Sequence, residues 1–435
     1  MKWALSNEVR PVASSSLPLR RVAVIGLGNA LEFYDFLVFS YFSIQIGHAF
    51  FPSPNSLLLT LATFGAGFVT RPLGGWVLGR YGDRVGRKPA MLWSFGLMGA
   101  SIVGLALTPS YAAIGIAAPV LLVLLRLVQG FAVGGEVGPS TAFLLESAPV
   151  ERRGLYVGLL CSTVYLAVVV AGIAGFTLST WLSPLALDRY GWRIAFLLGA
   201  AIVPLGWRLR RELPERRAEP EEGAEPRGAA PVGRRVVIAG VMIVAATTVT
   251  SYAMGYMATY MQDTLHLSAP LAFGEALLEG VVVMTATLAA GALSDRVGRR
   301  PLMLGALGML LVLAVPGYWL IIAMRSALAV YTVCAVFNAL YGVFWSVAAV
   351  AIVESLPASR RSGTYGLLYS ATVAVFGGLT QFAMQWLIGA TGSPLAPAWY
   401  LSATLLLGAV GMRLLPESAP QAARRGAAAG AVPAS

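Results

Sequence analysis

The sequence predicts an all-α polytopic membrane protein with twelve transmembrane helices, and three observations support this prediction. Apolar residue types make up 57% of the 435 residues and charged types only 12%, about half the charged fraction of a soluble domain. Many apolar runs have the roughly 20 residues that a helix needs to cross the hydrocarbon core. Basic clusters separate alternate runs, which under the positive-inside rule predicts that both termini are cytoplasmic.

Twelve apolar runs are each expected to form one helix of two pseudo-symmetric six-helix bundles. Backbone groups in lipid must be hydrogen-bonded within their own segment, and runs of this length without alternation favour helices over barrel strands. In the first bundle, 22–209, the helices are expected at 22–47, 57–79, 89–108, 113–145, 154–180 and 191–209. In the second bundle, 236–415, they are expected at 236–260, 270–293, 301–323, 326–353, 362–390 and 397–415.

The remaining segments are polar and are expected in the cytoplasm. Residues 1–21 form an N-terminal tail without the apolar core and cleavage site of a signal peptide. Residues 210–235 are rich in Pro, Glu and Arg, which is typical of a linker. Residues 416–435 are expected to form a disordered tail.

The net charge of +11 reflects topology rather than nucleic-acid binding. Lys and Arg gather between alternate apolar runs, and the intervening loops hold only Arg189, Arg193 and Arg325. A nucleic-acid-binding protein would instead collect its basic residues on one soluble face. Neither the two cysteines nor the two histidines have the spacing of a disulfide framework or a metal site, so no metal is expected.

Two motifs recur at matching places in the two bundles. The segment Gly79-Arg-Tyr-Gly-Asp-Arg-Val-Gly-Arg-Lys-Pro89 returns as Gly291-Ala-Leu-Ser-Asp-Arg-Val-Gly-Arg-Arg-Pro301, each after the second span of its bundle. A Glu-Ser-x-Pro segment followed by two arginines comes after each fourth span, and each bundle ends in Leu-Pro-Glu. An internal repeat of this kind supports the division into two halves.

The doubled G-x-x-x-D-R-x-G-R-[KR] loop resembles the signature of the major facilitator superfamily. Further segments resemble its metabolite:proton symporter family, most of all the citrate and tricarballylate branch. These segments are 28–36, 67–75, 126–130, 134–136, 191–193, 376–378, 391–392 and 397–400, together with 111–119, 181–184 and 265–268.

The resemblance implies a monomeric symporter of the bacterial inner membrane that binds substrate between its halves near the midplane and uses protons, without a cofactor. We therefore expect proton-coupled uptake of a small organic anion, a di- or tricarboxylate such as citrate. The branch tends to have prolines where this chain has Ala258 and Gln381, and a small polar patch where it has 343–345. A zwitterionic or cyclic-acid metabolite therefore remains an alternative substrate.

Two classes of protein compete with this interpretation. Proton-driven efflux antiporters usually have a Gly-Pro motif in span five, but 167–175 contains no proline. A membrane enzyme would need a catalytic motif, and neither H-E-x-x-H nor G-x-S-x-G is found. Efflux remains an alternative, and no enzymatic activity is expected.

Two acids of the first span, Asp35 and Glu32, are expected to carry the coupling proton. They are three residues apart and share a helix face with Asn29. Asp35 follows Arg21 by 14 residues, which places it about 21 Å into the span. Desolvation there favours the neutral acid and a nearby cation favours the anion, a balance that suits a proton carrier. A static ion pair is the alternative.

Two intramembrane arginines, Arg71 and Arg126, are expected to bind substrate because a planar guanidinium matches a carboxylate. Gln129 lies one helical turn after Arg126 on the fourth span, and Glu136 lies on nearly the same face as Gln129; with Asn29 they complete the expected polar set. Charges in the membrane are costly and therefore usually functional.

The partners of these arginines are left open. Resemblance to sugar–proton carriers implies an ion pair between Asp35 and Arg126. A purely structural bridge, either Arg71–Glu136 or Arg126–Glu32, is the alternative.

Two further sets of polar side chains lie in spans seven and eight. Tyr252, Tyr256 and Tyr260 recur every fourth residue; Tyr252 and Tyr256 are expected to line the cavity, with aromatic packing or an interfacial belt as the alternative. Glu275 and Glu279 share a face, and like charges so placed repel. One of them is therefore protonated, or both line a solvated vestibule, which is the preferred interpretation.

Charged residues at the inner ends of spans two and four, and of spans eight and ten, are expected to form a gate. The resemblance implies that such loops brace the outward-open state; a topology signal alone is the alternative. The eight residues are Asp83, Arg87, Glu146 and Arg152 in the first half and Asp295, Arg299, Glu354 and Arg360 in the second.

Overall fold

The structure is a computed structural model that describes residues 33–85, 87–134, 152–211, 233–357, 361–415 and 417. Every regular element within these residues is a helix. We call residues 33–211 the first half and residues 233–417 the second half.

The first half begins with a helical segment at residues 33–41. The elements that follow are α2 (Ser43–Phe50), α3 (Ser56–Val69), α4 (Arg71–Val85), α5 (Arg87–Leu107), α6 (Tyr111–Ile114), α7 (Ala117–Val133), α9 (Arg153–Trp181), α10 (Pro184–Ala186), the π-helix η2 (Leu187–Gly191) and α11 (Trp192–Arg211).

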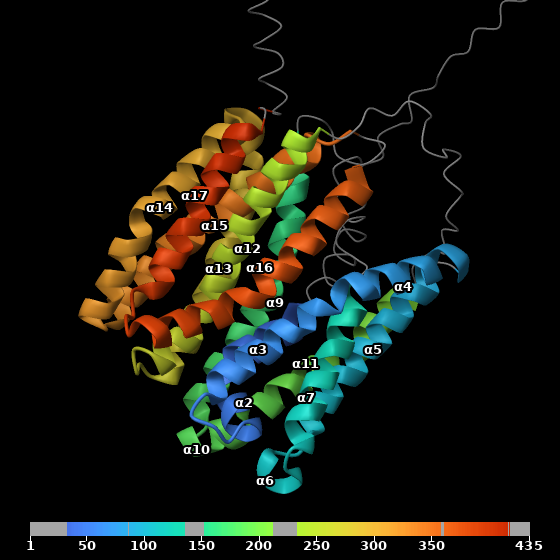
Figure 1. Cartoon of the computed structure of the whole chain (residues 1–435), viewed down its shortest axis with the longest axis vertical. Helices are drawn as coiled ribbons and strands as arrows, with labels where there is room; N and C mark the ends of the chain where they lie inside the picture. Colours follow the sequence, from blue (N-terminus) through green and yellow to red (C-terminus); the bar gives the residue numbers. More distant parts are fainter. Residues whose placement is uncertain are drawn as a thin grey trace, which may run out of the picture.

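The second half contains six long helices. They are α12 (Arg234–Asp263), α13 (Ala269–Val297), α14 (Arg299–Met324), α15 (Ala327–Glu354), α16 (Arg361–Thr391) and α17 (Ala396–Leu414). Figure 1 shows α14, α15 and α17 on one side of the molecule and α4, α5 and α7 on the other, with α3 meeting α16 near the middle.

Eight helical segments of the described part are long and apolar enough to cross a membrane, so the chain is a multi-pass membrane protein. The segment Ala117–Val133 is also apolar but shorter. The total of twelve spans and the cytoplasmic position of both termini remain predictions. The eight segments are Ser56–Tyr81, Pro89–Leu107, Arg153–Trp181, Arg234–Asp263, Ala269–Val297, Arg299–Met324, Ala327–Glu354 and Gly363–Thr391.

Two spans that the sequence predicts as continuous are interrupted. The chain turns at Phe42 before α2 begins, and Thr70 separates α3 from α4. The Thr70 hydroxyl donates a hydrogen bond to the carbonyl oxygen of Leu127 in α7, at 2.6 Å. Hydropathy carries no sign of such a contact between helices, so ranges drawn from hydropathy miss these breaks.

Apolar side chains cover the outside of the molecule, and charged side chains lie inside it. Val312 and Leu367 are 67% and 74% exposed, whereas Asp35 and Arg126 are 0% exposed. A water-soluble protein would distribute these residues the other way. This distribution fits a protein that is surrounded by lipid, because charged side chains in membrane proteins face the bundle interior.

The two halves meet where small residues let helices approach closely. Helix α9 packs against α13 and α15, and α3 packs against α16. A methyl group added at Gly154 would collide with the backbone of Gly291, and one added at Gly65 with that of Gly378. Close approach of helices through small residues is the usual way in which helices pack in membranes.

We name the two ends of the molecule by the predicted topology. The inner end is the one at which α9, α12, α14 and α16 begin, and the sequence predicts that it faces the cytoplasm. The outer end is the opposite one.

Candidate functional site

A cavity of about 130 Å³ lies between the two halves. The first half lines it with residues 33–40, Phe64 and the inner part of α9, and the second half with α12, α13, α15 and α16. Its aromatic lining consists of Phe33, Phe36, Phe64, Tyr165, Tyr252, Tyr341, Trp345, Tyr365 and Tyr369, and its polar lining of Ser40, Thr247, Thr248, Ser251, Gln381 and Glu279.

The charged side chain that lines the cavity is not one of those that the sequence predicts to bind substrate. Glu279 is the one charged side chain among the described residues that line it. Arg71, Arg126 and Gln129 are predicted to bind substrate, yet none of them lines the cavity in this conformation. They lie behind the wall that the first half contributes, and their role in binding stays a prediction.

Asp35 and Arg126 lie buried behind this wall within electrostatic range of each other, although neither Asp35 oxygen has a hydrogen-bond partner among the described residues. Both are 0% exposed, and Arg126 is the largest charge acting on the Asp35 carboxylate, with Arg71 as a second cation. These are the two residues that the resemblance to sugar–proton carriers pairs. The structure therefore places Asp35, Arg126 and Arg71 close together, and their roles in coupling and binding stay predictions.

Aromatic rings cover both guanidinium groups. The Arg126 guanidinium carbon lies 4.5 Å from the centre of the Phe36 ring and 4.3 Å from that of Phe39. The Arg71 guanidinium carbon lies 3.9 Å from the centre of the Phe68 ring. Such cation–π contacts stabilise a desolvated cation by about 0.5–2 kcal/mol. Phe36 belongs to the cavity lining, so the ring separates the arginine from the cavity.

The close packing of α3 against α7 sets the position of Arg126. A methyl group added at Gly67 would lie 3.2 Å from the Arg126 carbonyl oxygen, and one added at Gly130 would collide with the backbone of Gly67. The absence of a side chain at Gly67 and Gly130 allows this close approach. It brings the Arg126 side chain next to the helical residues 33–41.

Several polar atoms of this cluster have no hydrogen-bond partner among the described residues. These atoms are the two carboxylate oxygens of Asp35, Nε of Arg71, Nε and Nη2 of Arg126, and Nε2 of Gln129. Only Nη1 of Arg126 donates within the cluster, to Oε1 of Gln129. Unpartnered buried polar groups cost about 1–3 kcal/mol each, so the arginine and glutamine donors favour a group that accepts hydrogen bonds, and the Asp35 oxygens favour a group that donates them.

The tyrosines of α12 separate into two groups. Tyr252 lines the cavity and interacts through its side chain with Arg71. Tyr256 does not line the cavity, and its hydroxyl donates to Oε1 of Gln385 in α16. The Tyr260 hydroxyl donates to the Pro394 carbonyl oxygen at 2.8 Å. For Tyr256 and Tyr260 the structure therefore agrees with the alternative of aromatic packing.

Polar contacts that the sequence-based prediction misses join the halves on the outer side of the cavity. Gln381 Nε2 donates to Ser40 Oγ at 2.7 Å, and the hydroxyls of Ser43 and Thr259 are 2.9 Å apart. The Tyr41 hydroxyl donates to Glu279 at 3.3 Å. Single Ser and Thr residues in apolar runs give no sequence signal, whereas Gln381 stands out as an amide inside an apolar run.

Glu279 borders the cavity and Glu275 does not, so the two carboxyls do not both line a solvated vestibule, which corrects the preferred interpretation from the sequence. Their residues are 1% and 2% exposed. Helix α13 is covered by α9 and α15 along this stretch, so the external end of the span is enclosed by protein. Of the two readings, the one with a protonated carboxyl remains.

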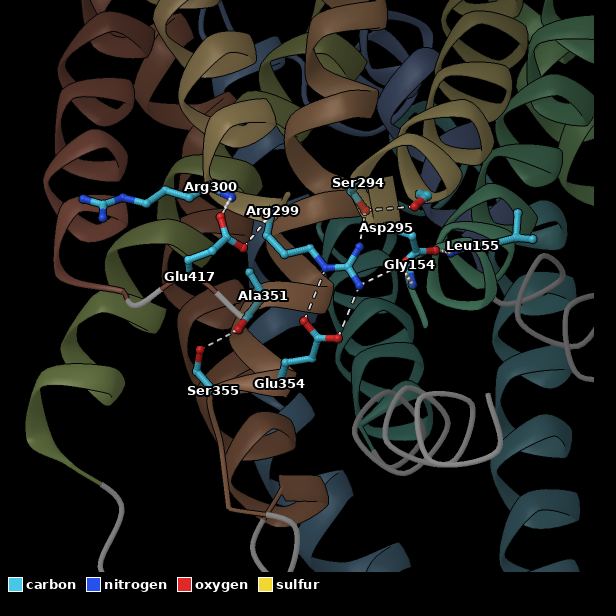
Figure 2. A network of polar contacts seen from close by, with 11 residues as sticks. Gly154, Leu155, Ser294, Asp295, Arg299, Arg300, Ala351, Glu354, Ser355 and Glu417 are labelled. Atoms are coloured by element: carbon cyan, nitrogen blue, oxygen red, sulfur yellow. Dashed lines mark hydrogen bonds and ion pairs between the residues drawn. The ribbon is translucent and has the colours of Figure 1, made fainter. Parts of the chain in front are cut away.

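A polar network at the inner end joins three of the predicted gate residues (Figure 2). Nη2 of Arg299 donates to Asp295 at 2.7 Å and to Glu354 at 3.3 Å, and Nε donates to Glu354 at 3.3 Å. The side chains of all three are at most 7% exposed. The network therefore excludes most water, and its gating role stays a prediction.

Asp295 also connects the two halves. Its carboxylate oxygens accept hydrogen bonds from the backbone N–H groups of Gly154 and Leu155, at 2.9 and 3.1 Å. These groups open the first turn of α9, where helix N–H groups lack partners within the helix. The second-half motif thus caps a first-half helix at the inner end (Figure 2).

The other residues of the motif have identifiable structural roles. Gly298 has φ of 117°, a conformation that favours glycine, and it joins α13 to α14. The Glu417 carboxylate accepts hydrogen bonds from the backbone N–H groups of Arg299 and Arg300, at 3.0 and 2.9 Å. The start of α14 is therefore capped by Glu417, which lies three residues beyond the end of α17.

The matching gate set of the first half is only partly described. Arg152 is exposed at the N-cap of α9. Asp83 and Arg87 lie in α4 and α5, and their side chains lie outside the described part of the structure. Asn29, Glu32, Glu136, Glu146 and Arg360 also lie outside the described residues.

Two helical halves that enclose a cavity can be compared with known protein families. Residues 25–379 match the model described as Major Facilitator Superfamily. The chain belongs to the major facilitator superfamily. The predicted membership is thereby confirmed, and because this superfamily consists of transporters, the chain is not an enzyme.

Relatives within the major facilitator superfamily match nearly the whole chain. The citrate-proton symporter of Salmonella typhi is 34% identical, over 93% of this chain and 95% of its own length. The ectoine/proline transporter of Corynebacterium glutamicum is 32% identical, over 90% and 82%. The alpha-ketoglutarate permease of Escherichia coli is 33% identical, over 89% and 92%.

A solved major facilitator structure has the same fold. The crystal structure of a D-xylose-proton symporter covers 92% of this chain and 98% of its own length, with a TM-score of 0.74. Its sequence is only 19% identical, so this likeness concerns the fold alone.

Proposed function

We propose that this chain is a proton-coupled symporter of the bacterial inner membrane that takes up a small organic anion, a di- or tricarboxylate such as citrate. The observation that carries the proposal is the set of buried Arg71 and Arg126 donors without hydrogen-bond acceptors. A carboxylate satisfies such donors with charge-assisted hydrogen bonds. Relatives named for transport of citrate and alpha-ketoglutarate support the same substrate class.

Asp35 couples the proton to the substrate in this proposal. While it is ionised, its charge offsets that of Arg126, which lies in the same buried cluster. Protonation removes this interaction and leaves the guanidinium to attract a substrate carboxylate. Phe36 and Phe64 both line the cavity and cover Arg126, so their rings turn aside as the substrate approaches.

The test is uptake into proteoliposomes with an imposed pH gradient, inside alkaline. Radiolabelled citrate, alpha-ketoglutarate and a zwitterionic amino acid are compared at equal concentration. We expect accumulation of a carboxylate that disappears when the gradient is collapsed. Accumulation that does not depend on the gradient would contradict proton coupling.

The variant Asp35→Asn tests the coupling residue separately. It is expected to bind substrate and exchange it between the two sides of the membrane, but to lose accumulation against a gradient. Asp188→Asn is the matched control, because Asp188 pairs with His48 at the exposed outer surface. Full proton-driven accumulation by Asp35→Asn would exclude Asp35 as the coupling carboxyl.

A zwitterionic substrate is the second candidate, and the lining of the cavity favours it. Aromatic rings around a single acid, Glu279, suit a substituted ammonium group, and a carboxylate of the same molecule can still reach Arg126. One relative is named for ectoine and proline. Preferential uptake of the zwitterion in the panel above would select this candidate over the polycarboxylates.

A further inference from the structure

The second half holds two buried carboxyls that the proposed mechanism does not use. Glu275 and Glu279 lie one turn apart on α13, are 1% and 2% exposed, and their charges act on each other. Neither forms an ion pair with a cation of the described residues. Two anions so close together in a low-dielectric interior repel strongly, so they do not both stay ionised without a bound cation.

Neutral groups surround this pair on every helix that reaches it. Residues 33–41 contribute Tyr41, and α9 contributes Tyr165. Helix α14 contributes Tyr318, and α15 contributes Tyr331 and Cys334. From α12 no charged side chain of the described residues acts on either carboxyl. The compensating positive charge must therefore be a small cation that enters the site.

Asn338 of α15 supplies an independent observation that points to this cation. It is 0% exposed, and its Nδ2 donates to Oε1 of Glu275 at 3.3 Å. The other oxygens of the two groups, Oε2 of Glu275 and Oδ1 of Asn338, are buried and accept no hydrogen bond within the described part of the chain, where the nearby Cys334 thiol interacts with Glu275. One proton on Oε2 would satisfy both, because the resulting O–H can donate to the amide oxygen while the amide N–H donates to the acid.

We propose that Glu275, Glu279 and Asn338 form a second proton-binding site, separate from Asp35. Glu275 holds the proton against Asn338, and Glu279, which lines the cavity, exchanges it with the cavity. The Tyr41 hydroxyl bonds to Glu279 from the first half, so occupancy of the site is linked to the contact between the halves on the outer side. Its contribution to coupling rests on the proposed proton symport, whereas the binding site itself does not.

Infrared spectroscopy of the purified protein in lipid vesicles tests the site without any substrate. A protonated carboxyl has its own carbonyl stretching band, and the Asp35→Asn background removes any contribution from Asp35. We expect this band at neutral pH in Asp35→Asn. The band should be lost when Glu275→Gln is added to Asp35→Asn. When Glu279→Gln is added instead, hydrogen–deuterium exchange of the band should be slower. Adding Asp188→Asn should leave the band unchanged, because that acid is exposed.

Two further measurements keep the proposal open to contradiction if a variant folds poorly. Asn338→Leu should shift the band, because the acid loses its hydrogen-bond acceptor. Glu275→Gln imitates the protonated acid, so its thermal unfolding temperature should match that of the wild type. Absence of the band in Asp35→Asn, or stabilisation of the wild type by Na⁺ that Glu275→Gln abolishes, would overturn the proposal in favour of two ionised carboxyls.

Transport distinguishes failure of this site from failure of the proposed function. If the symport is proton-coupled, Glu275→Gln should carry one proton fewer per substrate, measured from the pH gradient that balances a fixed substrate gradient. An unchanged ratio of protons to substrate would overturn the proposed role of the site in coupling. Uptake that needs no pH gradient, together with an intact infrared band, would instead refute the proposed symport and leave the site standing.

Discussion

Arg126 is a buried cation whose surroundings satisfy it only in part. Its guanidinium faces aromatic rings and donates to Gln129, while Nε and Nη2 have no partner among the described residues. Cation–π contacts offset some of the desolvation cost, but they do not replace hydrogen bonds. A side chain left in this condition is more stable when a carboxylate reaches it than when the cavity is empty.

Replacing Arg126 with lysine should therefore weaken substrate binding without unfolding the protein. Lysine keeps the charge but lacks the planar fork, and loss of a charged hydrogen bond of about 1.5–3 kcal/mol corresponds to a KM about 10–100-fold higher. The measurement is KM for uptake. Arg80→Lys is the matched control, because Arg80 is exposed beside Trp76; equal KM values in both variants would contradict a binding role.

The helices show what the sequence could and could not predict. Hydropathy and charge alternation predict the long spans of the second half to within a few residues, because each is one uninterrupted apolar helix. The turns at Phe42 and Thr70 leave no hydropathy pattern, and Thr70 bonds to the neighbouring helix α7. For the same reason the sequence places Glu275 in contact with water, whereas only the fold shows that α9 and α15 cover it.

The contact between α9 and α13 leads to a prediction about these elements. A methyl group on Gly291 would collide with the Gly154 backbone, so Gly291→Ala should push the two helices apart at the inner end, at a cost of about 1–3 kcal/mol. Cys161 lines the cavity and reports the opening through its rate of modification by a maleimide, read by mass spectrometry. Gly305→Ala, at a helix position with open space, should react at the wild-type rate, and equal rates in both variants would contradict the prediction.

Polar contacts join the two halves on both sides of the cavity. At the outer side the contacts run through Ser40, Gln381 and Tyr41, and at the inner end through Asp295 and the start of α9. A transporter that alternates between two states must break these sets in turn. Because each set consists of a few hydrogen bonds, the states differ by only a few kcal/mol, within the range that a ligand can shift.

Asp295→Asn should therefore favour opening of the inner end. It removes the charge that binds Arg299 and the α9 N-terminus, and a loss of about 1.5 kcal/mol shifts the ratio of open to closed molecules roughly tenfold. The distance across this end can be measured by double electron–electron resonance. The spin labels are placed at the exposed residues Val85 and Leu367, in a variant without native cysteines. Arg296→Gln, at an exposed neighbour, should keep the wild-type distances; unchanged distances in Asp295→Asn would contradict the prediction.

The Glu417 carboxylate accepts hydrogen bonds from the first turn of α14 and so fastens the segment after the last helix to the loop between α13 and α14, which is predicted to take part in the gate. A fusion partner or a truncation near residue 417 would then alter how readily the protein opens, even though this residue is remote from the cavity. Engineered versions for biochemical work should therefore keep the chain intact through this glutamate.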